Sequence, residues 1–280
     1  MRRKWNGSFV RPSVVLLTLA VSAAAAEPAT PASAPAQPTA GQEKIPAPHP
    51  LARQRFVPTD IDWNHPVYAT DFSDARALAD WKLEGGHRMS IRDGKLLLEN
   101  KSDNPTPTPS QGHLVCWLTK EMPADFLLQF KLRPHDRKEG LAIVFFNARG
   151  RAGQSIFDPG LAPRDGTFSQ YHSGDLNNYH VSYWAGSRPT AHIRKNKGFA
   201  LVAAGPDLVA GAPAETFQTV RIYKRGALIR VMVDDVVSVA FDDDGKTYGP
   251  VWTHSGWIGL RQMEHTIRCE YDELRVWRLK

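Results

Sequence analysis

The fold class is decided by residues 217–241, which read FQTVRIYKRGALIRVMVDDVVSVAF. Apolar and polar side chains alternate along this stretch, and that period is typical of half-buried β-strands. Gly226 and the pair Asp234-Asp235 interrupt the alternation, and these residue types favour tight turns. The stretch therefore predicts three consecutive antiparallel strands joined by two turns.

The same pattern continues on both sides of this stretch. Short apolar and aromatic runs, separated by turns rich in Gly, Pro, Asn and Asp, occupy residues 95–100, 113–118, 125–133, 140–147, 178–184, 190–195, 257–263 and 266–279. Only residues 73–83 predict a helix, of one or two turns. Many short strands with almost no helical periodicity indicate a sandwich or a barrel, and residues 56–280 are long enough for two stacked sheets. We expect an all-β, antiparallel two-sheet sandwich.

Residues 1–26 have the features of a secretory signal peptide. Four basic residues precede or border a short apolar run, VVLLTLAV at 14–21, and small residues at 23–26 offer a cleavage site before Glu27. The run is shorter than the roughly 20 apolar residues that a membrane span needs. We predict a periplasmic or secreted protein without membrane contact after cleavage, and a retained N-terminal anchor is the alternative.

A spacer and a nearly neutral domain follow the signal sequence. Residues 27–55 are rich in Pro and Ala, and such a composition predicts a disordered linker. Residues 1–26 hold four positive charges and no negative ones, so their removal lowers the formal charge from +6 to +2. Nucleic-acid-binding proteins concentrate a large basic excess, so we expect no nucleic-acid partner.

Cys116 and Cys269 each lie in an expected strand. An oxidising compartment would permit a disulfide bond between them, and two buried thiols are the alternative. No CxxC motif is present, so a zinc or redox site is not indicated. The run at 242–245, DDDG, predicts a turn, because it lacks a recognisable spacing of calcium ligands. We expect neither a metal nor a cofactor.

Polar, aromatic and histidine residues are concentrated between residues 170 and 197. Because successive side chains of a strand point to opposite faces, the core-facing residues are expected to be Tyr179, Val181, Tyr183 and Ile193. The opposite face is expected to carry His180, Ser182, Trp184, His192 and Arg194. Loop residues Tyr171, His172 and Asp175 would lie at the rim of this patch.

This composition is suited to sugar recognition. Aromatic rings pack against the apolar faces of a pyranose, and Arg, Asn and Asp groups hydrogen-bond its hydroxyls. The polar face of any half-solvated sheet also carries some of these residues. The density of aromatic and histidine side chains favours a carbohydrate site.

One reaction that the patch could perform is β-elimination at a uronic acid. A cation, Arg194 or Arg261, would neutralise the carboxylate and acidify the adjacent C–H. The candidates for the base that removes the proton, and for the acid that protonates the leaving oxygen, are His172, Tyr179, His180 and Tyr183. Hydrolysis by paired carboxylates is disfavoured, because the ExDxxE pattern of jelly-roll glucanases is absent. No GxSxG, GxGxxG or P-loop motif occurs either.

Three motifs together resemble the YesU-like family, a domain of unknown function. They are YHSGDLNNYHVSYW (171–184), HIRKNKGFALVAAGPD (192–207) and GWIGLRQMEHT (256–266). GLAIVFFNARG (140–150) and the R-x-G-x-x-x-x-Y run at 164–171 are similar as well, so the resemblance covers roughly residues 65–280. It implies a concanavalin A-like jelly roll and a carbohydrate context, since members of the family occur among genes for degrading rhamnogalacturonan-type and other acidic polysaccharides. The motifs carry over the positions Tyr171, His172, Asp175, Tyr179, His180, Tyr183, Arg194, Lys195, Arg261 and Gln262.

These observations lead to one main hypothesis and two alternatives. The main hypothesis is an exported eliminase, a lyase or dehydratase, acting on oligosaccharides that contain uronic acids. Its catalytic candidates are His172, Tyr179, His180, Tyr183 and Arg194. Its substrate-binding candidates are Tyr171, Asp175, Trp184, His192, Lys195, Arg261 and Gln262. The alternatives are a non-catalytic carbohydrate-binding module and an enzyme that cleaves 3-keto-glycosides.

Overall fold

The computed structural model describes residues 43–101, 112–135, 140–184, 188–212 and 216–280. The compact unit within it is Lys44–Lys280. The predicted signal peptide, residues 1–26, lies outside the described residues. Within the described ranges, no helix has the length and apolar character needed to cross a membrane.

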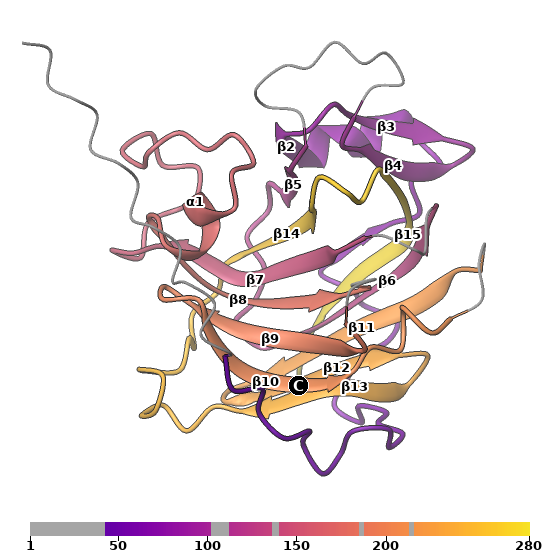
Figure 1. The fold of residues 1–280 in the computed structure, drawn as a ribbon. Helices are drawn as coiled ribbons and strands as arrows, with labels where there is room; N and C mark the ends of the chain where they lie inside the picture. Colours follow the sequence, from indigo (N-terminus) through magenta and orange to yellow (C-terminus); the bar gives the residue numbers. More distant parts are fainter. Residues whose placement is uncertain (1–42, 102–111, 136–139, 185–187, 213–215) are drawn as a thin grey trace, which may run out of the picture. The chain divides into compact units, whose positions relative to one another are not determined.

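The chain folds into two antiparallel β-sheets (Figure 1). The eight-stranded sheet contains β1 (Tyr68–Thr70), β3 (Arg88–Arg92), β4 (Lys95–Glu99), β6 (Phe126–Pro134), β11 (Gln218–Arg225), β12 (Leu228–Val233), β13 (Val236–Asp242) and β15 (Arg268–Arg278). Its order is β13-β12-β11-β6-β15-β4-β3, and β1 pairs with β15. The seven-stranded sheet contains β2 (Trp81–Gly85), β5 (Leu114–Leu118), β7 (Ala142–Gly150), β8 (Leu176–Tyr183), β9 (Thr190–Asn196), β10 (Ala200–Pro206) and β14 (Trp257–Gln262). Its order is β10-β9-β8-β7-β14-β5-β2.

The expected sandwich is confirmed, and so is the series of strands at 217–241. That stretch forms β11, β12 and β13, which pair consecutively and antiparallel. The expected helical stretch contains a 3₁₀ helix, η1 (Ala75–Asp80), capped by the Asp74 carboxylate. Strands β1, β2, β3 and β10 were not expected. β10, for example, is built from small residues, ALVAAGP, which give little alternation of apolar and polar side chains.

The main core lies between the two sheets. In β6 the alternating residues Leu128, Phe130 and Leu132 point into it, and Val144 and Phe146 of β7 meet them from the other sheet. In β7 the intervening residues are buried as well, because a long connection covers the outer face of the seven-stranded sheet. This double burial explains why β7 reads as a continuous apolar run in the sequence.

One edge of the sandwich is closed by contact between β10 and β13. At Gly205 a Cβ atom would lie 2.0 Å from the Ser238 carbonyl oxygen, so only glycine fits at this position. The Ser238 hydroxyl donates a hydrogen bond to the Pro206 carbonyl, which joins the two strands side chain to backbone. This close approach brings the edge strands of the two sheets together.

The folded unit begins earlier than the sequence suggests. Leu51 and Phe56 pack against a cluster on the outer face of the eight-stranded sheet that contains Tyr223 and Trp277. The backbone N–H of Arg53 donates to the Val237 carbonyl. Residues 44–55 of the expected linker therefore belong to the folded unit.

The two cysteines are both buried free thiols. Cys116 lies on β5 of the seven-stranded sheet, and Cys269 lies on β15 of the eight-stranded sheet. Burial raises the pKa of the Cys116 thiol, so it stays protonated and unreactive. Of the two alternatives left open by the sequence, the structure has the thiols rather than the disulfide.

Candidate functional site

The outer face of the seven-stranded sheet, which points away from the other sheet, carries two rows of neighbouring side chains. The first row is Lys82, Trp117, Gly259, Phe145, His180, Arg194 and Leu201. The second row is Glu84, Val115, Arg261, Ile143, Ser182, His192 and Ala204. Strand pairing thus places His180, Ser182, His192 and Arg194 on one face, as expected.

The connection between β7 and β8 covers part of this face. It contains the short helix α1 (Ser169–His172), which lies beside the seven-stranded sheet (Figure 1). The Tyr171 ring stacks on Phe145, with ring centroids 5.6 Å apart, and also contacts Trp117. Tyr171 is therefore fully buried between the connection and the sheet, where its side chain supports the site without being exposed to solvent.

We use the term His180 cluster for the group of side chains that meet beside α1. Its members are Phe168, His172, His180, Arg194, Asn196, Phe199 and Arg261. The rings of Phe168 and Phe199 lie 5.4 Å apart, and both contact the two imidazoles. Both phenylalanines are only half-buried, so they form the accessible part of the cluster.

A chain of amides determines the tautomer of His180. Asn178 Nδ2 donates to the Tyr171 carbonyl at 2.9 Å, which leaves Asn178 Oδ1 as an acceptor. Asn196 Nδ2 donates to that oxygen at 2.7 Å and lies 2.8 Å from His180 Nδ1. Because a primary amide nitrogen donates two hydrogen bonds and accepts none, His180 Nδ1 must be the acceptor. His180 therefore carries its proton on Nε2 and presents a hydrogen-bond donor.

His172 has more freedom. Its Nδ1 lies 2.6 Å from the Ser173 hydroxyl, which can either donate or accept. When Ser173 accepts, Nε2 of His172 is left with a lone pair and can take a proton. Within the His180 cluster, His172 is thus the imidazole suited to act as a base.

Two guanidinium groups flank the imidazoles. Arg194 lies 3.9 Å from the centroid of the Phe199 ring and donates to the Phe199 carbonyl. Arg261 is fully buried, lies 4.6 Å from the centroid of Phe168, and donates from Nη1 to the Gly166 carbonyl. Its Nε and Nη2 atoms have no hydrogen-bond partner among the described residues. A buried donor without a partner is costly, so a ligand or water is expected at this position.

The cluster is electropositive. Burial, followed by the charges of Arg194, His172, Arg261 and Arg188, holds the pKa of His180 well below its ordinary value. Burial and the two cluster arginines lower the pKa of His172 to about 4. Burial lowers the pKa of Arg261 to about 9, which still leaves it charged at pH 7. At neutral pH both imidazoles are uncharged and both arginines are cations, so the cluster attracts an anion.

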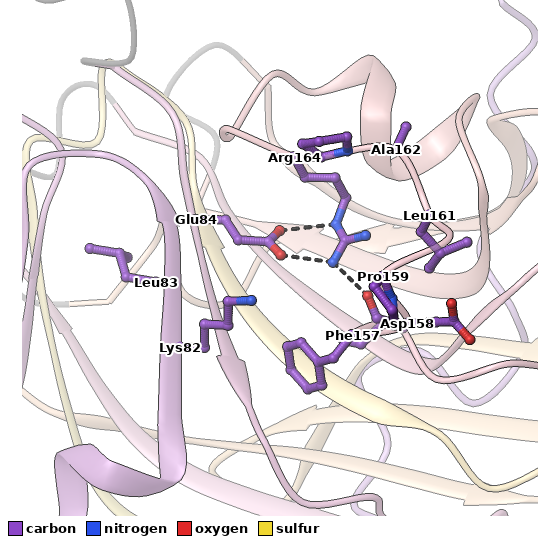
Figure 2. Close-up of a pocket in the computed structure, with 11 residues that line it drawn as sticks. Lys82, Leu83, Glu84, Phe157, Asp158, Pro159, Leu161, Ala162 and Arg164 are labelled. Carbon is purple, nitrogen blue, oxygen red and sulfur yellow. Dashed lines mark hydrogen bonds and ion pairs between the residues drawn. The ribbon is translucent and has the colours of Figure 1, made fainter.

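A buried carboxylate anchors the covering connection. Glu84 of β2 accepts hydrogen bonds from Arg164, from the Tyr171 hydroxyl and from the Trp117 indole. Figure 2 shows the two bonds between Glu84 and Arg164, and the Phe157 ring beside Lys82 at the edge of a pocket of about 330 Å³. Since both charges of this pair are buried, it fixes the connection on the sheet rather than offering a reactive carboxylate.

His192 and Asp175 lie outside the cluster. His192 is one row away from His180, where its two ring nitrogens contact Arg188 and Thr190. The Asp175 carboxylate accepts from the Ala162 backbone N–H, and its carbonyl accepts from Arg151. These contacts give Asp175 a role in shaping the covering connection.

Several expected site residues lie on the inner face of the sheet instead. Tyr179 and Tyr183 point into the core, as alternation predicts, and so cannot act together with His180. Lys195 is the cross-strand partner of Tyr179 and shares that face. Gln262 follows Arg261 directly and is also buried. Because adjacent strand residues point to opposite faces, the proposed acid–base set is divided by the sheet.

Lys195 belongs to a buried polar network at one end of the core. Its ammonium donates to the Asp243 carboxylate at 2.6 Å and to the Gly249 carbonyl. The Tyr179 hydroxyl donates to the same carboxylate, and burial together with this bond raises the pKa of Tyr179. We expected a turn at 242–245, and there the exposed Asp244 carboxylate accepts from the backbone N–H groups of Lys246 and Thr247. Asp243 is instead a buried counter-ion.

Trp184 does not lie on the outer face of the sheet, where its ring was expected to stack on a sugar. β8 ends at Tyr183, and Trp184 has a φ of 52°, in the left-handed region. This turn of the backbone breaks the alternation and directs the indole into the inter-sheet core, where it lies against Gly140. The aromatic groups near His180 are Phe145 of β7, Phe168 of the covering connection and Phe199 of the β9–β10 turn.

Several residues of the site were not predicted from the sequence, because the local patterns that could indicate them are weak. Asn178 and Asn196 lie within the polar stretch at 170–197, and alternation places them on the His180 face. Phe199 follows Gly198 in a turn, and nothing local indicates that its ring folds back onto His172. Across the described ranges, no group of three or more His, Cys, Asp or Glu side chains is placed to hold a metal.

The family model described as "Domain of unknown function (DUF1961)" matches residues 65–276. The chain belongs to this family. It is 33% identical over 217 residues to the uncharacterized protein YesU of Bacillus subtilis (strain 168), an alignment that covers 75% of this chain and 94% of YesU. The family resemblance noted in the sequence is therefore confirmed.

Solved structures show the same fold. A Bacillus subtilis protein of unknown function with a galectin-like fold superposes with a TM-score of 0.68 at 30% identity, covering 76% of this chain and 96% of that one. An endo-β-1,3-glucanase from Pyrococcus furiosus superposes with a TM-score of 0.55 at 15% identity, covering 77% and 94%. The DUF1961 domain described here is thus a concanavalin A-like jelly roll.

Proposed function

We propose that the His180 cluster binds an acidic saccharide and that the protein is an eliminase, a lyase or dehydratase, acting on oligosaccharides that contain uronic acids. The jelly-roll fold supports the saccharide class, because glucanases are among its structural neighbours. The expectation of an acidic ligand follows from the charges of the His180 cluster.

The observation that carries the proposal is the state of Arg261. Its guanidinium is fully buried, and two of its nitrogen atoms lack partners among the described residues. Isolated charges are rarely buried unless a partner compensates them. A carboxylate bound by two parallel hydrogen bonds would satisfy both nitrogen atoms and the charge. A uronate ring supplies such a carboxylate, and the half-buried rings of Phe168 and Phe199 supply apolar surfaces for its carbon face.

The reaction requires a proton to leave C5 of the uronate. With the carboxylate held by Arg261 and Arg194, negative charge that develops at C5 is stabilised, which acidifies the C5–H bond. His172 Nε2 removes that proton, a C4=C5 double bond forms, and the C4–O bond breaks. The leaving oxygen takes a proton from the medium or from the imidazolium formed on His172. His180 donates its Nε2–H to an oxygen of the substrate throughout.

Substrate binding would also prepare the base. The pKa of about 4 of His172 reflects burial and the positive charges of Arg261 and Arg194. A bound carboxylate offsets those cations and therefore raises the pKa of His172 toward neutrality. The base would gain proton affinity only when an acidic sugar is present.

The test is an assay for unsaturated uronate, followed by its ultraviolet absorbance, with pectic, ulvan-like and related uronate oligosaccharides. We expect turnover by the native protein, loss of turnover with retained binding for His172→Asn, and loss of binding for Arg261→Met. Tyr183→Phe is the matched control, since it alters a buried inner-face hydroxyl that has no partner among the described residues. Absence of the chromophore over a wide range of uronates would refute the elimination.

The second candidate is a non-catalytic carbohydrate-binding module. It is favoured by the inner-face position of Tyr179 and Tyr183, which removes the tyrosines that could have protonated the leaving group. Calorimetry that shows tight binding of an unchanged uronate, with His172→Asn altering affinity alone, would select it. Cleavage that requires a 3-keto-glycoside would select the third function instead.

We place this activity outside the cytoplasm because of the leader at residues 1–26. Fractionation of cells that produce the full chain would test this location. Recovery of an uncleaved protein in the cytoplasm would contradict it.

A further inference from the structure

A second candidate site lies on the outer face of the eight-stranded sheet. Strand pairing places Arg221 of β11, Gln129 of β6 and Arg275 of β15 side by side in one row. Trp277 of β15 lies in the next row, and Trp63 of the N-terminal segment packs edge-on against it with ring centroids 5.2 Å apart. These side chains, with Asn64 and Pro66, line a pocket of about 520 Å³.

The tryptophan pair is built rigidly, although one ring is open to solvent. The Trp277 indole N–H donates to the Trp63 carbonyl at 3.1 Å, which ties the N-terminal segment to the sheet. Trp277 is buried, whereas Trp63 is 45% exposed. A large apolar ring is thus held in a fixed position at the wall of a polar pocket.

The floor of the pocket presents planar hydrogen-bonding groups. Arg221 donates to the Gln129 side-chain oxygen at 2.7 Å and forms an ion pair with Asp235. Arg275 forms a loose ion pair with Glu273, at 4.0 Å, and is itself 41% exposed on its side chain. Donors of Arg275 and the amide nitrogen of Gln129 therefore face the pocket with capacity for further hydrogen bonds.

We infer that this pocket is a second binding site for a saccharide, separate from the His180 cluster. An exposed tryptophan face beside planar guanidinium and amide donors is the arrangement that recognises a pyranose: the ring packs on the indole and the hydroxyls bond to the donors. The pocket volume lies within the usual range for small-ligand sites. The choice of a saccharide as the ligand class rests in part on the proposed function.

An interface between copies of the chain is less consistent with this surface. A stable dimer buries about 800 Å² on each partner, with an apolar centre. Here the exposed apolar part is the Trp63 ring with Pro66 beside it, and charged groups surround it. This pocket, here called the Trp63 pocket, and the His180 cluster lie on opposite sheets. One segment of a polymer would be held at the Trp63 pocket while another segment of the same polymer reaches the His180 cluster.

The experiment uses the full chain carrying Arg261→Met, which is expected to remove binding at the His180 cluster, so that retention reports on the Trp63 pocket. Native electrophoresis is run in gels that contain homogalacturonan, rhamnogalacturonan, β-glucan or arabinan. We expect retardation by at least one polymer, and at least about tenfold weaker retardation on adding Trp63→Ala or Arg275→Ala. The matched control is Tyr248→Ala, which removes another exposed aromatic ring that lies outside the pocket; it should leave mobility unchanged.

Three results would overturn the inference. The first is that none of the polymers retards the Arg261→Met protein. The second is that retardation persists in both pocket variants. The third is sedimentation that shows a dimer dissolved by Trp63→Ala, since the surface would then be an interface between copies. None of these results affects the proposed function, which stands or falls with formation of unsaturated uronate by the native protein.

Discussion

Replacing Asp243 by Asn is expected to destabilise the protein strongly without altering saccharide binding. The Asp243 carboxylate is fully buried and accepts from the Lys195 ammonium at 2.6 Å and from the Tyr179 hydroxyl at 2.5 Å. Asparagine keeps the shape and one acceptor, but it leaves the Lys195 charge, whose side chain is 2% exposed, without its counter-ion. Removing one partner of a buried ion pair typically costs about 3–5 kcal/mol.

The lower end of that range applies here. Lys195 retains its bond to the Gly249 carbonyl at 2.7 Å and lies 5.5 Å from the Trp252 ring centroid, so part of its charge stays compensated. We expect a loss of about 3 kcal/mol in the free energy of unfolding. For a chain of this size that corresponds to a shift of about 1 M in the urea midpoint.

The assay is urea denaturation followed by tryptophan fluorescence. The matched control is Asp244→Asn, because the neighbouring carboxylate is solvent-exposed and only caps a turn. The double variant Lys195→Met, Asp243→Leu should recover most of the loss, since a well-packed apolar pair replaces the ions. If Asp243→Asn unfolds within about 1 kcal/mol of Asp244→Asn, the buried network does not stabilise the fold in the way argued here.

Three further predictions concern other parts of the fold. Glu84→Gln should lower stability by about 3 kcal/mol, measured by thermal unfolding, because the buried Arg164 guanidinium loses its counter-charge; an unchanged Tm would contradict this. Folding lowers the pKa of His172 to about 4, so the unfolded chain binds a proton at this imidazole before the folded chain does as the pH falls. The free energy of unfolding should therefore decline between about pH 6.5 and 4, by up to about 3 kcal/mol. In urea denaturation at a series of pH values, His172→Asn should make this decline less steep. Gly205→Ala should lower the free energy of unfolding by about 1–3 kcal/mol, because the added Cβ meets the backbone of β13. Gly211→Ala, which has open space around it, should not lower it. Equal Tm values for the two variants would show that the close approach at Gly205 does not require glycine.

The sequence determined the fold class and the faces of the central strands. Alternation along residues 217–241 sufficed for three consecutive strands, and the same rule placed Tyr179 and Tyr183 inward and His180 outward. This worked because the two-residue period of a strand is a local property of the backbone. The same alternation already shows that the proposed acid–base set cannot act together, because residues on opposite faces of one strand cannot meet at one substrate.

Other features depended on contacts that no local pattern encodes. Phe168 reaches His180 through a covering connection, and Phe199 reaches His172 through a turn. Asp243 meets Lys195 across 48 positions of chain, although its sequence context, DDDG, is that of an exposed turn. The Trp63 pocket likewise joins an N-terminal segment to strands near the C-terminus.

The physical reason is the range over which each rule acts. Strand periodicity follows from backbone geometry over a few residues, so the sequence alone determined which face a side chain occupies. Which side chains share that face, and which of them are sealed from water, follows from sheet order and from how the connections pack. The tertiary structure therefore decided that His180 carries its proton on Nε2, that Arg261 is buried with no counter-charge among the described residues, and that Trp184 belongs to the core.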